Sequence, residues 1–162
     1  MNIGTSFITE FDHEMANTRI VLEHVNDDLL DWKAGENLNS IRWVASHLVD
    51  IPSWIDVTIN ADSFDIAPPD GPPHTTPMLE SVSAMLTAFD QHVSTGRELI
   101  ASASDETYMK DWSLLQGGQA LMTMPRVAIV RSFILNHIIH HRAFLCVYLR
   151  LNGIDVPGMY GP

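Results

Sequence analysis

The sequence has little of several features that define common protein classes. Its single cysteine, Cys146, excludes an internal disulfide and a metal cluster built on thiolates. Lysine and arginine together number 9 against 20 aspartates and glutamates, for a formal net charge of −11. Because nucleic acids and anionic membranes bind basic patches, we expect neither as a partner.

Long apolar runs are also missing. No run approaches the ~20 apolar residues that a membrane-spanning helix needs. Residues 1–6 carry neither the basic start nor the apolar stretch of a secretory signal, so we expect a cytoplasmic protein. Gly117 and Gly118 stand alone, and the sequence therefore contains no glycine-rich phosphate-binding loop.

Helical periodicity is what the sequence does have. Apolar residues recur every three to four positions in four segments, whereas no segment alternates as a strand would. These segments cover about residues 6–30, 40–60, 77–101 and 125–152. Pro52 is expected to kink the second segment, and the stretch 102–123 is expected to be mostly irregular. We predict an all-α four-helix bundle in a single domain, residues 1–162, whose two long connections leave room for crossovers.

His137 and His141 lie one helical turn apart in the last predicted helix. At about 100° per residue both fall on one apolar stripe, opposite three arginines. The stripe contains Val130, Ile134, Phe144, Leu145 and Tyr148, and the opposite side contains Arg131, Arg142 and Arg150. Buried imidazoles are unfavourable unless they are hydrogen-bonded or bound to a metal. The pair therefore indicates a metal site.

A third ligand must come from another helix, because a catalytic site of the zinc type has three protein ligands and one open position. His47 is the best candidate, and Trp43 and Trp54 flank it and could wall a pocket. His47 could also be a half-exposed histidine at a helix seam. His140 is expected at the rim. Neutral imidazoles suit zinc, nickel, iron or copper, so the ligand set leaves the metal open.

The other histidines carry less weight. His92 is a weaker candidate for the pocket, and His13, His24 and His74 are expected to be solvated. Position 138 is isoleucine rather than the glutamate of a His-Glu-x-x-His motif, so a metalloprotease is not implied.

Several short motifs, in their order and spacing, carry a family resemblance over nearly the whole chain. The first helix contributes Phe11, Thr18-Arg19 and Leu22-Glu23, and the second contributes Ser40-Ile41, Ser46-His47-Leu48 and Trp54. The C-terminal part contributes Asn136-His-Ile-Ile-His-His-Arg142, Tyr148-Leu-Arg-Leu151, Val156-Pro157 and Tyr160-Gly-Pro162. Together these motifs resemble the DinB-like superfamily of bacterial proteins. The resemblance implies a DinB-like four-helix bundle with crossover connections, commonly dimeric.

The resemblance also implies a divalent metal ion, such as zinc, nickel or iron. One histidine of the second helix and an i, i+4 pair of the last would hold it, and the matching positions are His47, His137 and His141. Many relatives continue the His-His-Arg run with Gly-Gln, whereas this chain has Ala143-Phe144. Phe144 would therefore replace a polar pocket contact near the metal with an apolar one.

Some relatives resemble transferases and isomerases that use a low-molecular-weight thiol. By that resemblance we predict a metal-dependent thiol S-transferase acting on a small electrophile. Trp43, Trp54 and the region around Trp112 would shape the electrophile pocket, and no general acid or base stands out. One alternative is a non-catalytic metal-binding dimer of the stress response, which a closed coordination shell would favour. Another is a metal-free helical interaction module, in which Glu14 would bind the two histidines of the last helix.

Overall fold

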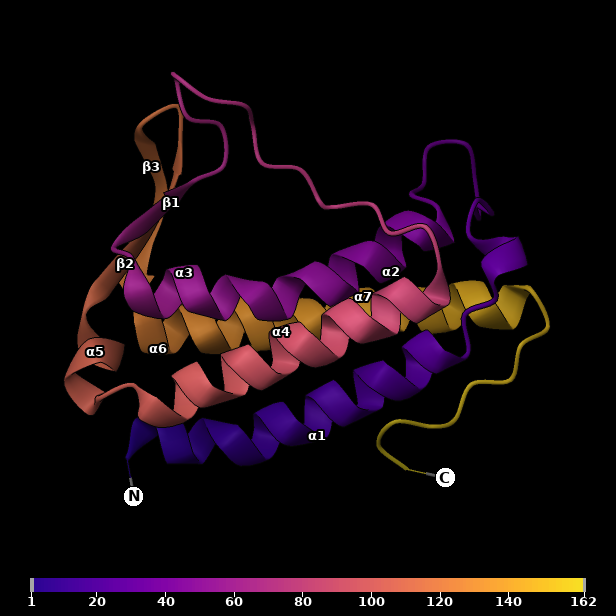
Figure 1. Cartoon of the computed structure of the whole chain (residues 1–162), viewed down its shortest axis with the longest axis horizontal. Helices are drawn as coiled ribbons and strands as arrows, with labels where there is room; N and C mark the ends of the chain where they lie inside the picture. Colours follow the sequence, from indigo (N-terminus) through magenta and orange to yellow (C-terminus); the bar gives the residue numbers. More distant parts are fainter. Residues whose placement is uncertain (1, 162) are drawn as a thin grey trace.

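Long helices make up most of the fold. The computed structural model describes residues 2–161, and its main helices lie side by side (Figure 1). They are α1 (Ile3–Glu23), α2 (Ile41–Asp50), α3 (Trp54–Asn60), α4 (Val82–Ser102) and α7 (Asn136–Leu151). Both α1 and α2 pack against α4 and α7. None of the described helices is both long and apolar enough to cross a membrane.

Side-chain caps determine where three of these helices begin. Asn2, Ser40 and Ser81 each accept a hydrogen bond from the backbone N–H three residues later. Such a cap satisfies an N–H that has no partner inside the helix. The predicted start at Ser40 is confirmed. The third predicted helix begins at Val82 rather than Pro77, because the cap is Ser81.

Three of the predicted helices are shorter or less regular than expected. The first ends at Glu23 and is followed by a 3-10 turn, η1 (Asp27–Leu29). Pro52 interrupts the second, as predicted, and the 3-10 turn η2 (Ile51–Ser53) separates α2 from α3. The last begins as α6 (Arg126–Ala128) and continues as a π-helix, η3 (Ile129–Leu135), before α7.

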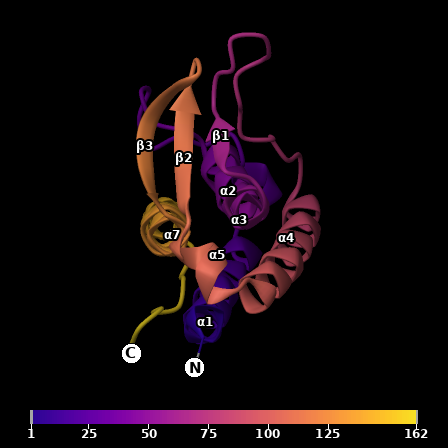
Figure 2. The same ribbon diagram turned by 90° about the vertical axis from the view of Figure 1, so that its left-hand side faces the viewer.

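The prediction of an all-α four-helix bundle is wrong, because the fold contains a three-stranded mixed sheet. β1 (Ser63–Asp65) pairs parallel with β2 (Asp111–Gln116), and β2 pairs antiparallel with β3 (Gln119–Pro125). The sheet lies at one end of the helices (Figure 1) and stands out to one side of them (Figure 2). A short helix, α5 (Asp105–Met109), precedes β2. The stretch expected to be irregular is therefore mostly ordered.

The β2–β3 hairpin has a clear turn but weak strand periodicity. Gly117 and Gly118 have φ angles of 60° and 76°, which a tight two-residue hairpin turn requires and glycine adopts readily. Their N–H groups donate to the carboxylate of Asp65, which ties the turn to β1. No residue of β3 is buried. The strand therefore lacks the alternation of buried apolar and exposed polar residues by which a half-buried strand is recognised.

Four of the five residues of the predicted stripe are buried, all except Phe144, but the face of α7 that packs into the core also includes residues outside the stripe. Its buried positions include Ile138, Arg142, Leu145 and Leu149. Phe144 is 44% exposed, and His137 and His141 are half-buried. The π-helix before α7 accounts for the error, because i→i+5 hydrogen bonds place more residues in a turn than an α-helical count assumes. The two histidines thus lie at the edge of the core.

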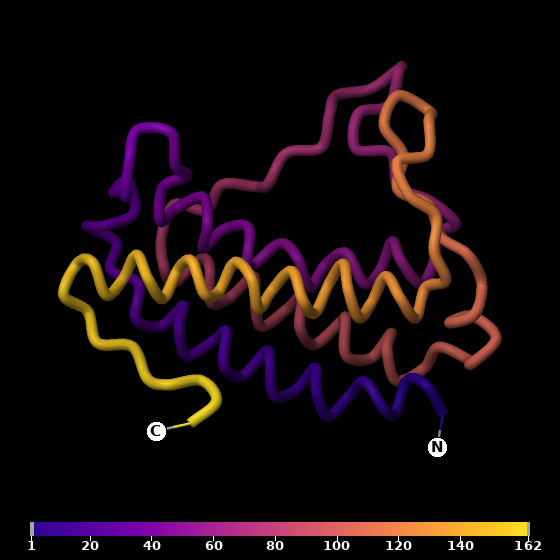
Figure 3. The backbone as a smooth tube through the Cα atoms, turned by 180° about the vertical axis from the view of Figure 1, so that it is seen from behind, coloured from indigo at the N-terminus to yellow at the C-terminus, as the bar shows by residue number. Residues whose placement is uncertain are grey.

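Arg142, predicted to face away from the core, is buried and anchors the C-terminal tail. Its Nη2 donates to Glu14 Oε2 at 2.6 Å, and the Tyr160 hydroxyl donates to the same oxygen at 2.8 Å. Figure 3 shows the tail running back past α7 towards α1. Glu14 therefore pairs with Arg142 and Tyr160, and it is not a partner of His137 or His141.

Candidate metal centre

Three histidines meet where α2 packs against α7. His47 lies on α2, and His137 and His141 lie on α7. Nε2 of His137 is 3.3 Å from Nε2 of His47 and 2.9 Å from Nε2 of His141. One nitrogen of each ring lies within 4.8 Å of the other two, and no other His, Cys, Asp or Glu among residues 2–161 joins this group.

The spacing of these nitrogens fits a single metal ion. Zinc–imidazole bonds of about 2.0–2.1 Å at tetrahedral angles place the ligand nitrogens roughly 3.3 Å apart. Each neutral imidazole has one donor and one acceptor nitrogen, so three Nε2 atoms that converge cannot all satisfy one another. A cation can accept all three lone pairs at once.

Burial keeps the three imidazoles neutral. Desolvation, reinforced by the neighbouring histidines, lowers the pKa of His47 from 6.5 to about 3 and the pKa of His141 to about 4. Desolvation is also the main cause that lowers the pKa of His137. Because only a neutral imidazole has a free lone pair for a metal, this environment favours metal binding.

The second ring nitrogen of His47 is held by the loop between β1 and α4. Thr76 Oγ1 lies 3.0 Å from Nδ1 of His47. When Nδ1 carries the proton and donates to this hydroxyl, Nε2 keeps its lone pair towards the other histidines. The neighbouring Ser46 holds the same loop, since its hydroxyl accepts a hydrogen bond from the N–H of Leu79 at 3.0 Å.

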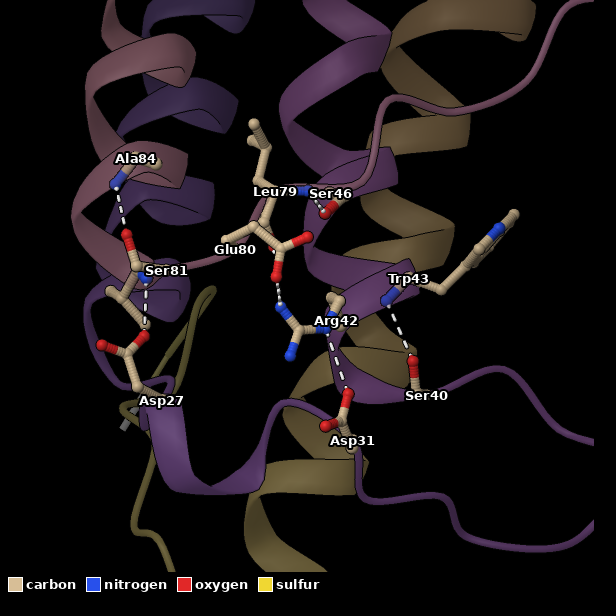
Figure 4. A network of polar contacts seen from close by, with 11 residues as sticks. Asp27, Asp31, Ser40, Arg42, Trp43, Ser46, Leu79, Glu80, Ser81 and Ala84 are labelled. Carbon is tan, nitrogen blue, oxygen red and sulfur yellow. Dashed lines mark hydrogen bonds and ion pairs between the residues drawn. The ribbon is translucent and has the colours of Figure 1, made fainter.

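Arg42 anchors the end of this loop that returns to α4 (Figure 4). Its guanidinium donates to the carbonyl of Leu79 at 3.3 Å and to Glu80 Oε2 at 3.0 Å. The same group donates to Asp31 Oδ1 at 3.1 Å. These contacts restrain the loop that carries Thr76.

Aromatic rings surround the histidines. Trp43 stacks on His47 with ring centroids 4.7 Å apart. The Trp54 ring lies 5.5 Å from His47 and 5.3 Å from His137. The structure therefore places both predicted wall residues beside the cluster.

His140 and Phe144 lie on the solvent side of the cluster. The His140 ring is 5.0 Å from that of His141 and 4.8 Å from that of Phe144, and both residues are exposed. Phe144 is thus a rim residue, whereas the sequence placed it on the core stripe.

Phe133 and His74 belong to the site although sequence reasoning did not select them. Phe133 stacks on Trp54 at 5.7 Å and lies 5.8 Å from His137. Its position four residues before His137 could have indicated that it lies beside the cluster, because residues four apart on a helix are neighbours. His74, predicted to be solvated, is exposed, and its ring also lies 3.5 Å from the buried carboxylate of Asp50. It lies in an irregular loop, where no periodicity could have placed it.

The remaining histidines stay outside the cluster. The His92 ring forms a hydrogen bond with the carbonyl of Val49 at 2.8 Å. His13 bonds to a side chain of its own helix, and His24 to a backbone carbonyl of the same helix.

A cavity of about 280 Å³ lies beside the cluster, between α3, the sheet and η3. Its apolar lining consists of Trp54, Val57, Phe64, Ile66, Trp112, Leu114 and Phe133, and its polar lining of Ser53, Asp56, Thr58 and His74. Trp54 and Phe133 also contact His137, so one layer of aromatic rings is shared by the cavity and the cluster. Trp112 lines this cavity from strand β2 rather than from the irregular stretch that the sequence predicted.

Comparison with known proteins agrees with this architecture. The family model described as DinB family matches residues 1–162. A DinB-like protein from Bacillus cereus is 21% identical, with a TM-score of 0.74 over 95% of each chain. A DinB-like protein from Bacillus subtilis is 15% identical, with a TM-score of 0.69 over 95% of this chain and 97% of its own.

At such identities the two structures support the fold alone. Comparison with curated proteins finds no match. The match to the family model spans all the motifs from which the resemblance was inferred, and that inference is confirmed. The chain belongs to the DinB family.

Proposed function

We propose that His47, His137 and His141 bind a divalent metal ion, and that the protein uses it to transfer a low-molecular-weight thiol to a small electrophile. The observation that carries the proposal is the convergence of three neutral Nε2 atoms beside an apolar cavity. Family membership is compatible with a metal, and zinc, nickel and iron all suit three imidazoles.

A bound divalent metal would supply Lewis acidity that lowers the pKa of a thiol and yields a thiolate at neutral pH. In the transfer, the thiol sulfur bonds to an electrophilic carbon, the leaving group departs with its electron pair, and the thiol proton passes to solvent. Thr76 would orient His47 during this reaction. Trp43 and Trp54 would keep water away from His47, since both rings cover it.

The open side of the cluster favours an enzyme over a structural metal site. Structural zinc sites are closed by four protein ligands, whereas catalytic sites leave a position free. Three histidines form the group within residues 2–161, and two of them are half-buried rather than enclosed. This argues against the non-catalytic alternative.

Dimer formation is a separate part of the proposal, taken from the family resemblance. Phe144, Val147 and Leu151 follow one another along α7 and are 44%, 52% and 63% exposed. Such an apolar row on a surface helix suits contact with a second copy. Size-exclusion chromatography with light scattering on wild type and on Val147→Glu tests it, because a dimer through this row should dissociate in the variant.

Metal content and transfer activity test the catalytic proposal. We expect close to one metal ion per chain in untagged protein, and its loss in His141→Ala. His24→Ala is the matched control, since His24 caps the C-terminal end of α1 outside the cluster and the variant should retain the metal. No metal after reconstitution with zinc, nickel and iron(II) would overturn the metal site. Metal without thiol transfer to any small electrophile would favour the non-catalytic alternative.

A further inference from the structure

We infer that the cavity between α3, the sheet and η3 binds an uncharged aromatic group of about two fused rings, the apolar part of the electrophile. The existence of the pocket follows from the fold. Its role as a substrate pocket rests on the proposed function.

The indole N–H groups of the aromatic walls already donate to other groups of the protein. Trp112 Nε1 donates to the carbonyl of Val57 at 3.1 Å. Trp54 Nε1 donates to Asp50 Oδ2 at 3.1 Å. Both indole N–H groups are therefore satisfied, and most of the lining is apolar side chain. Pockets of this kind select ligands by apolar and stacking contacts.

The charges around the cavity disfavour an anionic occupant. No lysine or arginine among the described residues lines it, and Asp56 at its wall is acidic. The nearby Arg126 is buried, and its guanidinium donates to the carbonyls of Thr58 and Ala61 and to Asp62. A carboxylate ligand would thus lose its hydration without gaining a lysine or arginine partner, and the one imidazole of the lining, His74, already faces the carboxylate of Asp50.

The volume sets the size of the occupant. An apolar cavity of about 150 Å³ is known to hold one benzene ring. The cavity here measures about 280 Å³, which suits a bicyclic aromatic group.

The position of the cavity connects it to the histidines. Trp54 and Phe133 stack on each other with an interplanar angle of 28°. The same two rings lie 5.3 and 5.8 Å from His137. An aromatic group in the cavity would therefore lie one ring layer from the converging nitrogens.

Binding of 2-naphthol, neutral at pH 7, and of 2-naphthoate, its anionic counterpart, tests this inference. The chain has four tryptophans, and their indole N–H signals in ¹H–¹⁵N spectra report the site directly. We expect 2-naphthol to shift the signals of Trp54 and Trp112, saturably and with a dissociation constant of about 1 mM or lower. The Trp32 signal should stay in place, and 2-naphthoate should bind at least about tenfold more weakly.

Two variants fill the cavity from two different elements of its wall. Val57→Phe acts from α3 and Leu114→Phe from β2, so one remains informative if the other fails to fold. Either folded variant should weaken 2-naphthol binding at least about tenfold, because the added ring occupies the pocket. Unchanged binding in a folded variant, equal binding of 2-naphthoate, or no saturable shift at Trp54 and Trp112 would overturn the inference.

The titration is done on metal-free wild type and on His141→Ala. If the protein bound no metal, the proposed function would be overturned, but binding of 2-naphthol in the cavity would stay intact. Absence of binding in a protein that does hold a metal would overturn the pocket alone.

Discussion

The hydroxyl of Thr76 lies 3.0 Å from Nδ1 of His47, across 29 positions of sequence. This contact makes the loop between β1 and α4 part of the candidate metal centre. A threonine in an irregular loop thereby offers an acceptor to Nδ1 of a helical histidine, which favours the tautomer whose Nε2 keeps its lone pair towards His137 and His141.

Replacing Thr76 with valine should weaken metal binding. Valine keeps the shape but removes the acceptor of the Nδ1 proton, and loss of such a partner lowers metal affinity about 10–100-fold. Competition with a chromophoric chelator measures the affinity. Thr76→Ser should retain most of it, and Thr75→Val, at an exposed neighbour, is the control. Equal affinities for Thr76→Val and wild type would show that the hydroxyl does not orient His47.

The metal-free protein should lose stability as the pH falls below 6.5. The folded-state pKa values of His47 and His141 are lowered to about 3 and about 4, so the unfolded chain binds more protons in this range. Their contribution is complete above pH 6.5 and is lost progressively towards pH 3–4. Urea unfolding at pH 7, 6 and 5 measures the effect.

Replacing His141 with glutamine removes one of the two histidines whose lowered pKa causes this loss of stability. Wild type should lose about 1 kcal/mol relative to this variant between pH 7 and pH 5, less than the full linkage value because the ring is half exposed. Parallel pH profiles of the two proteins would contradict the lowered pKa of His141.

Arg42→Met should loosen the loop that carries Thr76. The substitution removes three hydrogen bonds to Leu79, Glu80 and Asp31 while keeping most of the side-chain volume. Amide hydrogen exchange at Leu79 should become about tenfold faster, since a hydrogen bond to a charged group contributes about 1.5–3 kcal/mol. Arg19→Met removes a surface ion pair elsewhere and should leave that amide unchanged.

Arg142→Met should destabilise the fold strongly. The variant leaves the carboxylate of Glu14 buried without its cationic partner, which costs about 3–5 kcal/mol. Urea unfolding gives the free energy of unfolding. Arg97→Ala, which removes an exposed pair with Asp12, should cost about 1 kcal/mol or less.

A second substitution checks the cause. Glu14→Leu combined with Arg142→Met removes both charges, and it should recover much of the lost stability. A double variant as unstable as Arg142→Met alone would show that packing, rather than the unpaired charge, is responsible.

Predictions that depend only on residues close together in the chain agree with the structure. The i, i+4 spacing of His137 and His141 brings both rings to one side of α7. Pro52 interrupts its helix because it lacks an N–H. The sheet was missed because no residue of β3 is buried, although Gly117-Gly118 was a turn signal. A single-domain organisation and a cytoplasmic location stay predictions.

The sequence by itself determined the start of the second helix at Ser40, the histidine pair on one helix and membership of the DinB family, because these depend on residue types at short or fixed spacing. Only the tertiary structure decided that His47 meets His137 across 90 positions, that Arg142 is buried against Glu14, and that β1 and β2 complete a cavity beside Trp54. Those contacts join segments far apart in the chain. They depend on the π-helix, on the hydrogen bonds that hold the loop between β1 and α4, and on the sheet, which together set how the helices pack. Helical periodicity in the sequence predicts none of these features.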